Sequence, residues 1–114
     1  MNKSHPFDKS RPFDLICMGR VAVDFYADQI HSPLEHAQSF SRYLGGCAGN
    51  ISVGTSRLGL KSVMFSCVGT DDMGVFLRNQ LQFEGVDTCL LRSTPDHLTG
   101  LVVLGVCPPD RFPL

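Results

Sequence analysis

A few residues in the first half of this sequence have the chemistry to hold a ligand rich in hydroxyl groups. Asp24 places one charged acceptor inside the otherwise apolar stretch VAVDFYADQI. Gly45 and Gly46 allow positive φ and the close approach of a ligand to the backbone. Asn50 follows in the first turn of an expected helix, and its amide both donates and accepts hydrogen bonds. The candidate substrate-binding residues are Asp24, Gly45, Gly46 and Asn50.

The same residues also have a purely structural explanation. Glycines before a helix can serve tight packing alone, and an asparagine near a helix start can be a simple cap. Asp24 favours a ligand site, because a lone carboxylate in an apolar strand is costly to bury without a partner. The residue types by themselves leave both interpretations open.

Two phosphate-binding motifs can be tested against the glycine cluster YLGGCAGNISVGTSRLGL, residues 43–60. The dinucleotide fingerprint G-x-G-x-x-G does not fit the spacing of these glycines. Gly54 and Gly59 have the separation of a P-loop, but Leu60 intrudes before Lys61. That lysine would also lie at the end of the helix, away from the N-terminal amides that bind phosphate. The spacing therefore favours a sugar over a phosphate at this turn.

The elements that must position these residues alternate between strands and helices. We expect strands at 14–19, 21–30, 61–69, 86–92 and 98–106, a short strand or turn at 41–46, and helices at 48–59 and 71–85. Short apolar strands alternating with helices predict an α/β protein with a mainly parallel sheet. Such a sheet needs helices on both faces, and two helices are too few for both. The chain is therefore expected to be a piece of a longer protein.

Local signals give further detail for three of these segments. Helix 71–85 is expected to be capped by Asp71 or Asp72 and ended by Gly85. Its apolar stripe is Met73, Phe76, Leu77 and Leu81. In helix 48–59 the expected shared face is Ala48, Ile51, Thr55 and Leu58, with Gly59 as the stop. The dense Val and Leu of segment 98–106 predict burial on both of its faces.

Composition narrows the function classes. The 114 residues carry a net charge of −1, and without a basic excess we expect neither a nucleic acid nor a membrane as partner. The longest apolar run, 101–107, is too short to span a bilayer, and the first residues have no signal-peptide core. The five cysteines contain no C-x-x-C, and Cys17, Cys67 and Cys107 lie in apolar runs. These features predict a reduced, cytoplasmic protein without a metal site.

A joined set of motifs resembles the N-terminal signature of the ribokinase-like, or PfkB, carbohydrate kinases. The motifs are GGCAGN at 45–50 with Ser52, the helix end RLG at 57–59, and VGTDDMG at 68–74. The resemblance covers roughly 14–107. Within the family, the start GRVAVDFY and the ending TGLVVLGVCPPDRFPL are most similar to the 5-dehydro-2-deoxygluconokinases of myo-inositol breakdown.

The resemblance implies a ribokinase-like three-layer α/β sandwich with a small β lid, present here as its N-terminal portion. It implies ATP-dependent phosphorylation of a sugar hydroxymethyl group, with Mg²⁺ on the phosphates. Asp24 would bind substrate hydroxyls, and the glycines and Asn50 would line the same site. Segments 24–30 and 98–106 would contribute to the lid, through which a homodimer is possible. Gly69, Asp71 and Gly74 are expected to have a mainly structural role.

One motif of the family is missing from this sequence, and this bears on whether the chain could act as a kinase by itself. The family's second signature, a G-A-G-D segment with the catalytic aspartate, does not occur in these 114 residues. We therefore expect residues 1–13 to be a flexible lead-in and 14–114 to be the N-terminal part of a kinase domain, without catalytic, cofactor-binding or metal residues and inactive alone. The alternatives are a non-catalytic sugar-binding or regulatory module and a nucleotide-binding α/β domain of another class. Uncovered strand faces also predict poor solubility or association.

Overall fold

The computed structural model describes residues 7–107 and confirms the expected order of strands and helices. Residues 1–6 of the predicted lead-in and the ending 108–114 lie outside the described residues. The elements are β1 (Leu15–Met18), β2 (Ala22–Ala27), a short 3-10 helix (Leu34–His36), β3 (Phe40–Gly45), α1 (Cys47–Arg57), β4 (Ser62–Gly69), α2 (Asp72–Phe83), β5 (Leu91–Thr94) and β6 (Leu101–Leu104).

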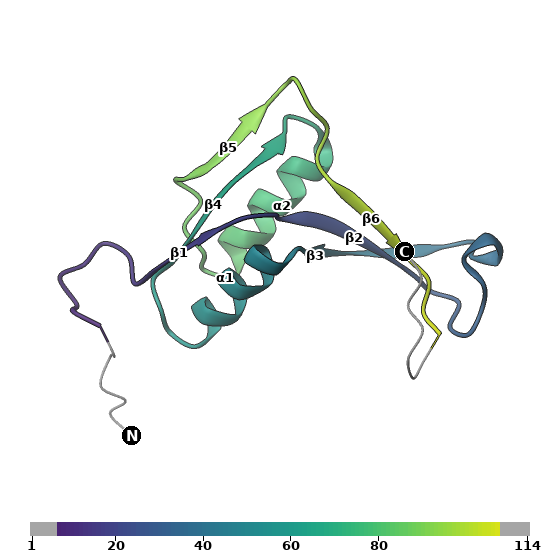
Figure 1. The fold of residues 1–114 in the computed structure, drawn as a ribbon, viewed down its shortest axis with the longest axis horizontal. Coiled ribbons are helices and arrows are strands. Elements are labelled where there is room, and N and C mark those ends of the chain that lie inside the picture. Colours follow the sequence, from purple (N-terminus) through teal and green to yellow (C-terminus); the bar gives the residue numbers. More distant parts are fainter. Residues whose placement is uncertain (1–6, 108–114) are drawn as a thin grey trace.

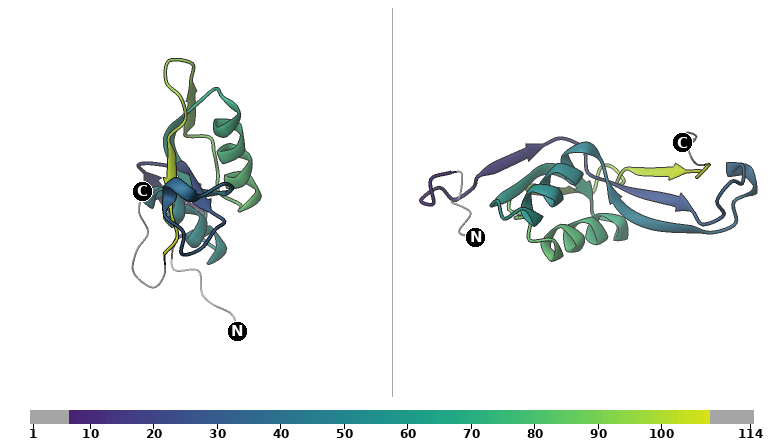
Figure 2. Two further views of the ribbon diagram at one scale, coloured as in Figure 1. Left: turned by 90° about the vertical axis from the view of Figure 1, so that its right-hand side faces the viewer. Right: turned by 90° about the horizontal axis from the view of Figure 1, so that it is seen from below.

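The main sheet has the order β1-β4-β5, and all of its pairs are parallel. Each parallel connection passes through a helix, as the strand and helix alternation predicted. Both α-helices lie on the same side of this sheet (Figures 1 and 2). The sequence-based prediction of an α/β protein with a mainly parallel sheet is therefore confirmed, with two of its three layers among the described residues.

A second small sheet has the order β3-β2-β6 and extends away from the main sheet (Figure 1). β2 pairs with β3 antiparallel and with β6 parallel, so that Val23 lies beside both Leu44 and Leu101. The segments expected to belong to one lid, 24–30 and 98–106, thus do lie in one sheet. This small sheet carries Asp24 in its central strand.

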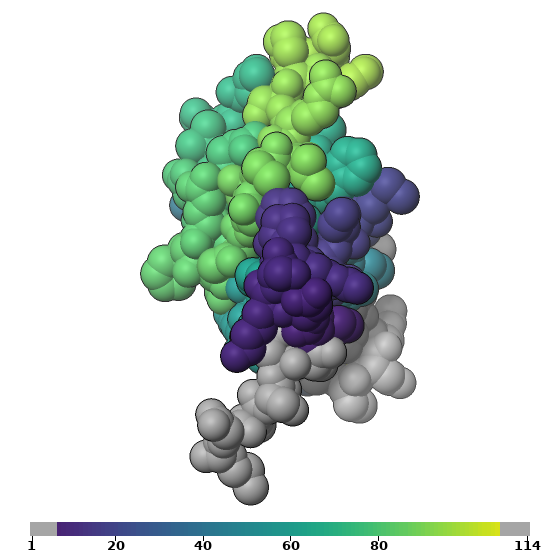
Figure 3. Space-filling view, turned by 90° about the vertical axis from the view of Figure 1, so that its left-hand side faces the viewer, coloured from purple at the N-terminus to yellow at the C-terminus, as the bar shows by residue number. Residues whose placement is uncertain are grey.

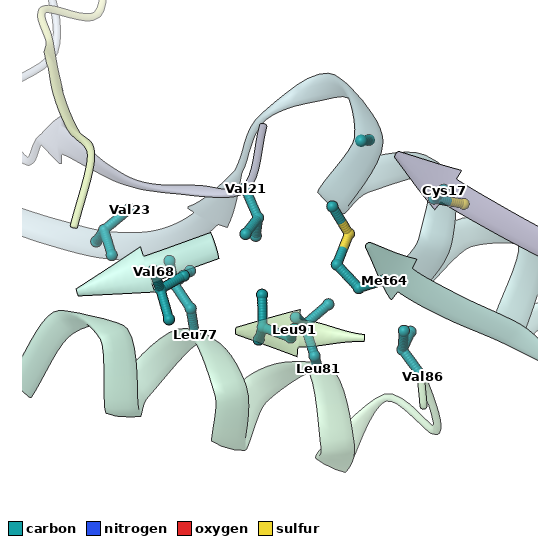
Figure 4. Packing of buried hydrophobic residues seen from close by; sticks show 10 residues of the cluster. Cys17, Val21, Val23, Met64, Val68, Leu77, Leu81, Val86 and Leu91 are labelled. Carbon is teal, nitrogen blue, oxygen red and sulfur yellow. The ribbon is translucent and has the colours of Figure 1, made fainter. Parts of the chain in front are cut away.

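The core lies between the main sheet and the two helices (Figure 4). Leu77 and Leu81 of α2 point toward Val68 and Met64 of β4, and all four side chains are buried. Met73 and Phe76 pack against this cluster, which confirms the predicted apolar stripe of α2. Because Val21 and Val23 belong to the same cluster, the start of the small sheet is anchored in the core.

α1 differs from its prediction in where it begins and in which face it buries. It begins at Cys47, and its buried residues are Ala48, Gly49 and Ser52. Leu58 is 83% exposed and Ile51 is exposed too, so the expected apolar face is wrong. Small residues let the helix approach the strands closely, and the buried Ser52 hydroxyl donates to the Gly49 carbonyl at 2.7 Å. Helical spacing predicts a buried face from its large apolar residues, so it does not detect a buried face that consists of small residues.

Several strands expose apolar side chains. Met18 of β1 is 75% exposed, and Ile16 and Phe65 on the same face of the main sheet are also exposed. Figure 3 shows the purple surface around β1 at the front of the molecule. In β6, Leu101 and Val103 are exposed, so the predicted burial of this segment on both faces is wrong. β6 lies at the edge of the small sheet, and Leu101 and Val103 stand on the same face of this strand.

All five cysteines are free thiols. Cys17 is buried among apolar side chains, and this burial raises the pKa of its thiol. Cys67 is exposed, so its expected role as a small buried hydrophobe is wrong. It lies on the face of β4 that no helix covers. Over residues 7–107 no helix has both the length and the apolar character needed to cross a membrane.

Candidate sugar-binding site

Asp24 lines a surface hollow beside the small sheet. In the register of β2 and β3 it stands directly opposite Tyr43. The hollow has a volume of about 480 Å³ and is lined by Asp24, Tyr26, Tyr43, Leu44 and Asn50. This volume lies within the range of small-molecule sites. The structure therefore brings Asp24 and Asn50, which are far apart in the sequence, to one concave surface.

Gly45 makes room for the Asp24 side chain. A β-carbon added at Gly45 would lie 2.1 Å from Oδ2 of Asp24. Gly45 pairs with Ala22 across the strands, so the carboxylate leans over the neighbouring backbone. The prediction for Gly45 was a positive φ and the approach of a ligand, but its φ is not positive, and the group that approaches its backbone is the Asp24 carboxylate. Neither Gly45 nor Gly46 lines the hollow.

Gly46 shapes the turn from β3 into α1. Its φ is 90°, and an added β-carbon would lie 2.4 Å from the carbonyl oxygen of Arg20. The backbone that comes close here belongs to the β1–β2 connection. The N–H of Gly49 donates to this same Arg20 carbonyl at 3.3 Å. Gly46 therefore fixes where α1 starts relative to β2, and so where Asn50 lies relative to Asp24.

Asn50 is not a helix cap. The N-cap of α1 is Gly46, which has no side-chain hydrogen bond, and Asn50 lies later in the first turn with its side chain exposed. Within residues 7–107 no hydrogen bond is made by the Asn50 amide or by the half-buried Asp24 carboxylate. Two polar groups that face one hollow without protein partners are available to a ligand.

In the second glycine motif, VGTDDMG at 68–74, the polar groups are hydrogen-bonded to other parts of the protein. Asp71 caps α2 by accepting from the Gly74 N–H at 3.0 Å through Oδ1, and its Oδ2 accepts from the Thr99 N–H at 2.9 Å. The Thr99 hydroxyl oxygen in turn accepts from the Gly69 N–H at 2.9 Å. The N–H groups of Thr99 and then Gly74 hold the pKa of the Asp71 carboxyl below its usual value. This confirms a structural role for Gly69, Asp71 and Gly74.

The tyrosines of the hollow were not among the candidates from the sequence. Tyr26 could have been found, because it follows Asp24 at the strand period of two and so shares its face of β2. Tyr43 could be placed only through strand pairing, since its position opposite Asp24 depends on the register of β2 and β3.

A parallel sheet covered by helices, joined to a small second sheet, defines an α/β protein. The pfkB family carbohydrate kinase profile matches residues 13–106. Since this match covers most of the chain, the chain belongs to the pfkB family of carbohydrate kinases.

The curated relatives of this chain include several enzymes with the same name, 5-dehydro-2-deoxygluconokinase. The chain is 47% identical over 106 residues to the 5-dehydro-2-deoxygluconokinase of Clostridium tetani, covering 92% of this chain and 31% of that enzyme. It is 36% identical over 105 residues to the 5-dehydro-2-deoxygluconokinase of Geobacillus kaustophilus, covering 91% and 31%. The chain thus spans about a third of the length of the curated relatives it matches.

Solved structures show the same fold. A PfkB protein from Polaromonas superposes with a TM-score of 0.82 at 34% identity, covering 89% of this chain and 34% of that protein. A sugar kinase from Pyrococcus horikoshii, crystallised in complex with ATP, superposes with a TM-score of 0.80 at 30% identity, covering 86% and 32%. The described part of this chain therefore has the ribokinase-like architecture expected from its motifs.

The described residues show no motif or side-chain cluster that by itself identifies a nucleotide or magnesium site. In the described part of the chain no group of three or more His, Cys, Asp or Glu residues could hold a metal ion. The glycine spacings of 45–59 match neither phosphate-binding motif. We therefore assign no step through ATP or Mg²⁺ to residues 7–107.

Proposed function

We propose that residues 14–114 form the N-terminal, sugar-binding part of a cytoplasmic PfkB carbohydrate kinase. The intact enzyme would phosphorylate the hydroxymethyl group of a sugar or keto-deoxy sugar acid, specifically 5-dehydro-2-deoxygluconate in myo-inositol catabolism. The observation that carries the proposal is the shared hollow of Asp24 and Asn50, whose polar groups have no hydrogen-bond partner within 7–107. The named activity of the curated relatives supports this substrate.

Each candidate residue has a distinct part in this proposal. The Asp24 carboxylate accepts hydrogen bonds from substrate hydroxyls, and Asn50 both donates and accepts. Gly45 leaves the space that the carboxylate occupies, and Gly46 sets the start of α1. ATP, Mg²⁺ and the catalytic aspartate would be bound or supplied by the remainder of the kinase, so this chain alone would bind sugar without phosphorylating it.

Titration calorimetry of the 114-residue chain tests the site. The ligands are 5-dehydro-2-deoxygluconate and a set of ketoses. Asp24→Asn and Asn50→Ala should each abolish the heat, and Gly45→Ala should do so by displacing the Asp24 carboxylate. Gly54→Ala is the matched control, because an added β-carbon there meets no atom within 4 Å. No heat with any ligand would overturn the proposed sugar site.

The sequence of the reading frame after Leu114 distinguishes the kinase from the alternative, a non-catalytic sugar-binding or regulatory module. A G-A-G-D segment encoded downstream of Leu114 would support the kinase. Sugar binding by the chain without such a segment in the following few hundred codons would favour the module. Tight ATP binding by the chain alone would instead favour the third class, a nucleotide-binding domain.

A dimer through the small sheet is the assembly that we propose for the kinase, and sedimentation of the intact protein tests it.

A further inference from the structure

The hollow around Asp24 has an aromatic wall. Tyr43 stands directly opposite Asp24 on β3, and Tyr26 follows it by one strand period on β2. The two rings meet edge to face, with centroids 5.6 Å apart and an interplanar angle of 75°. Their mutual contact holds the two rings in one arrangement beside the carboxylate.

The other flank of Asp24 is apolar as well. β6 pairs in register so that Val102 lies beside Asp24 and Leu104 beside Tyr26. Because paired residues of neighbouring strands share a face, Asp24 has Tyr43 on one side and Val102 on the other, and its carboxylate leans toward the Gly45 backbone. Sugar hydroxyls placed against these flanks would lose hydration without gaining partners, which is unfavourable.

Both tyrosines are accessible to a ligand. Tyr43 is 55% exposed and Tyr26 is half-buried. Neither hydroxyl makes a hydrogen bond to another residue of the part that the structure describes. Two open rings with free hydroxyls can contact the apolar surface of a sugar and then donate to an oxygen at its edge.

We propose that Tyr26 and Tyr43 select a substrate with a deoxygenated carbon. This inference rests on the proposed sugar site. 5-Dehydro-2-deoxygluconate has no hydroxyl on carbon 2, so it offers this wall a longer apolar segment than 5-dehydrogluconate, which differs by that hydroxyl. An apolar wall discriminates against an added hydroxyl by about 10- to 100-fold. Tyr26 and Tyr43 are thus specificity-determining residues, and Asp24 and Asn50 bind the hydroxyls common to both compounds.

The two compounds form a matched pair for calorimetry on the chain. Wild type should prefer the deoxy compound. Tyr43→Ala should weaken its binding by about 2- to 10-fold, the range of one aromatic contact, and reduce the preference. Tyr43→Phe keeps the ring and should keep the preference. Phe83→Ala is the control, because Phe83 is an 84% exposed aromatic residue on α2 that does not line the hollow.

Fluorescence gives a second readout that does not depend on a substitution. The chain has two tyrosines and no tryptophan, so emission excited at a wavelength that phenylalanine does not absorb comes from Tyr26 and Tyr43. Binding of the deoxy compound should change this emission. Heat of binding with unchanged emission, or with equal affinity in wild type and Tyr43→Ala, would overturn the role of the tyrosines and leave the sugar site standing. No heat with either compound would overturn the sugar site itself, and this inference with it.

Discussion

Two strand-to-helix junctions of this chain look alike in sequence and differ in structure. The β3–α1 junction contains Gly45, Gly46 and Asn50, and the β4–α2 junction contains Gly69 and Gly74. In the second junction Asp71 caps the helix and also binds the Thr99 N–H that leads into β6. In the first, no side chain caps the helix, and Asp24 and Asn50 make no hydrogen bond within 7–107.

The difference teaches how to separate structural glycine motifs from binding ones. Where every nearby polar group has a protein partner, the motif holds elements together and has nothing left for a ligand. Where polar groups face a hollow without partners, folding has left hydrogen-bonding capacity unused. Substitutions at the β4–α2 junction should therefore change stability, and substitutions at the β3–α1 hollow should change binding.

The largest effect on stability is expected at Gly74. A β-carbon there would lie 2.0 Å from the Gly69 carbonyl oxygen, and backbone cannot move aside cheaply. Gly74→Ala should destabilise the fold by about 3 kcal/mol, measured by urea denaturation. Gly54→Ala, with open space around it, should change stability by about 1 kcal/mol or less, in the stabilising direction. Equal effects of the two substitutions would refute the close packing of α2 on β4.

Asp71→Ala should have the next largest effect. It removes both the cap of α2 and the tie to Thr99, and we expect Tm to fall by about 4–8 °C. Asp72→Ala is the neighbouring control, because Asp72 is exposed and is not the N-cap residue. Thermal unfolding followed by circular dichroism measures both variants. A Tm for Asp71→Ala as high as that of Asp72→Ala would show that the hydrogen bonds of the Asp71 carboxylate to the Gly74 and Thr99 N–H groups do not stabilise the fold.

Acid should weaken the same junction. The pKa of Asp71 is lowered from 3.8, first by the Thr99 N–H and then by the Gly74 N–H. A carboxyl whose pKa is lower in the folded state contributes stability above its unfolded pKa, and this is lost as pH falls through the folded pKa. Between pH 7 and about 4 the gap in stability between wild type and Asp71→Asn should stay constant, and it should narrow below that. A gap that does not narrow on acid titration would contradict the lowered pKa.

The smallest effect on stability is expected at Asn50, although its effect on binding should be complete. Its side chain is exposed and is not a cap, and alanine is the better helix former by about 0.5 kcal/mol. Asn50→Ala should therefore leave stability unchanged or slightly raised while sugar binding is lost. Urea denaturation and calorimetry on one preparation measure both. A loss of 1 kcal/mol or more, typical of a lost cap, would restore the structural interpretation of Asn50.

The parts of the fold predicted correctly are those that local signals determine. The Asp71 cap, the Gly85 stop and the stripe containing Leu77 all lie within one helix, so the sequence reports them directly. α1 was harder to predict, because its buried face consists of small residues such as Gly49 and Ser52. What these residues gain is close approach to strands from elsewhere in the chain, and spacing within the helix does not encode it.

By itself the sequence determined the order of the elements, the Asp71 cap and the Gly85 stop of α2. It also showed that the glycines between Gly45 and Gly59 match neither phosphate motif, and it named four candidate binding residues. Only the tertiary structure decided that Asp24 and Asn50 share a hollow and that Tyr43 stands opposite Asp24. It also decided that Gly45 makes room for a carboxylate and Gly46 for a carbonyl. The physical reason is that a side chain's contacts across a sheet depend on strand register, which long-range pairing and packing set.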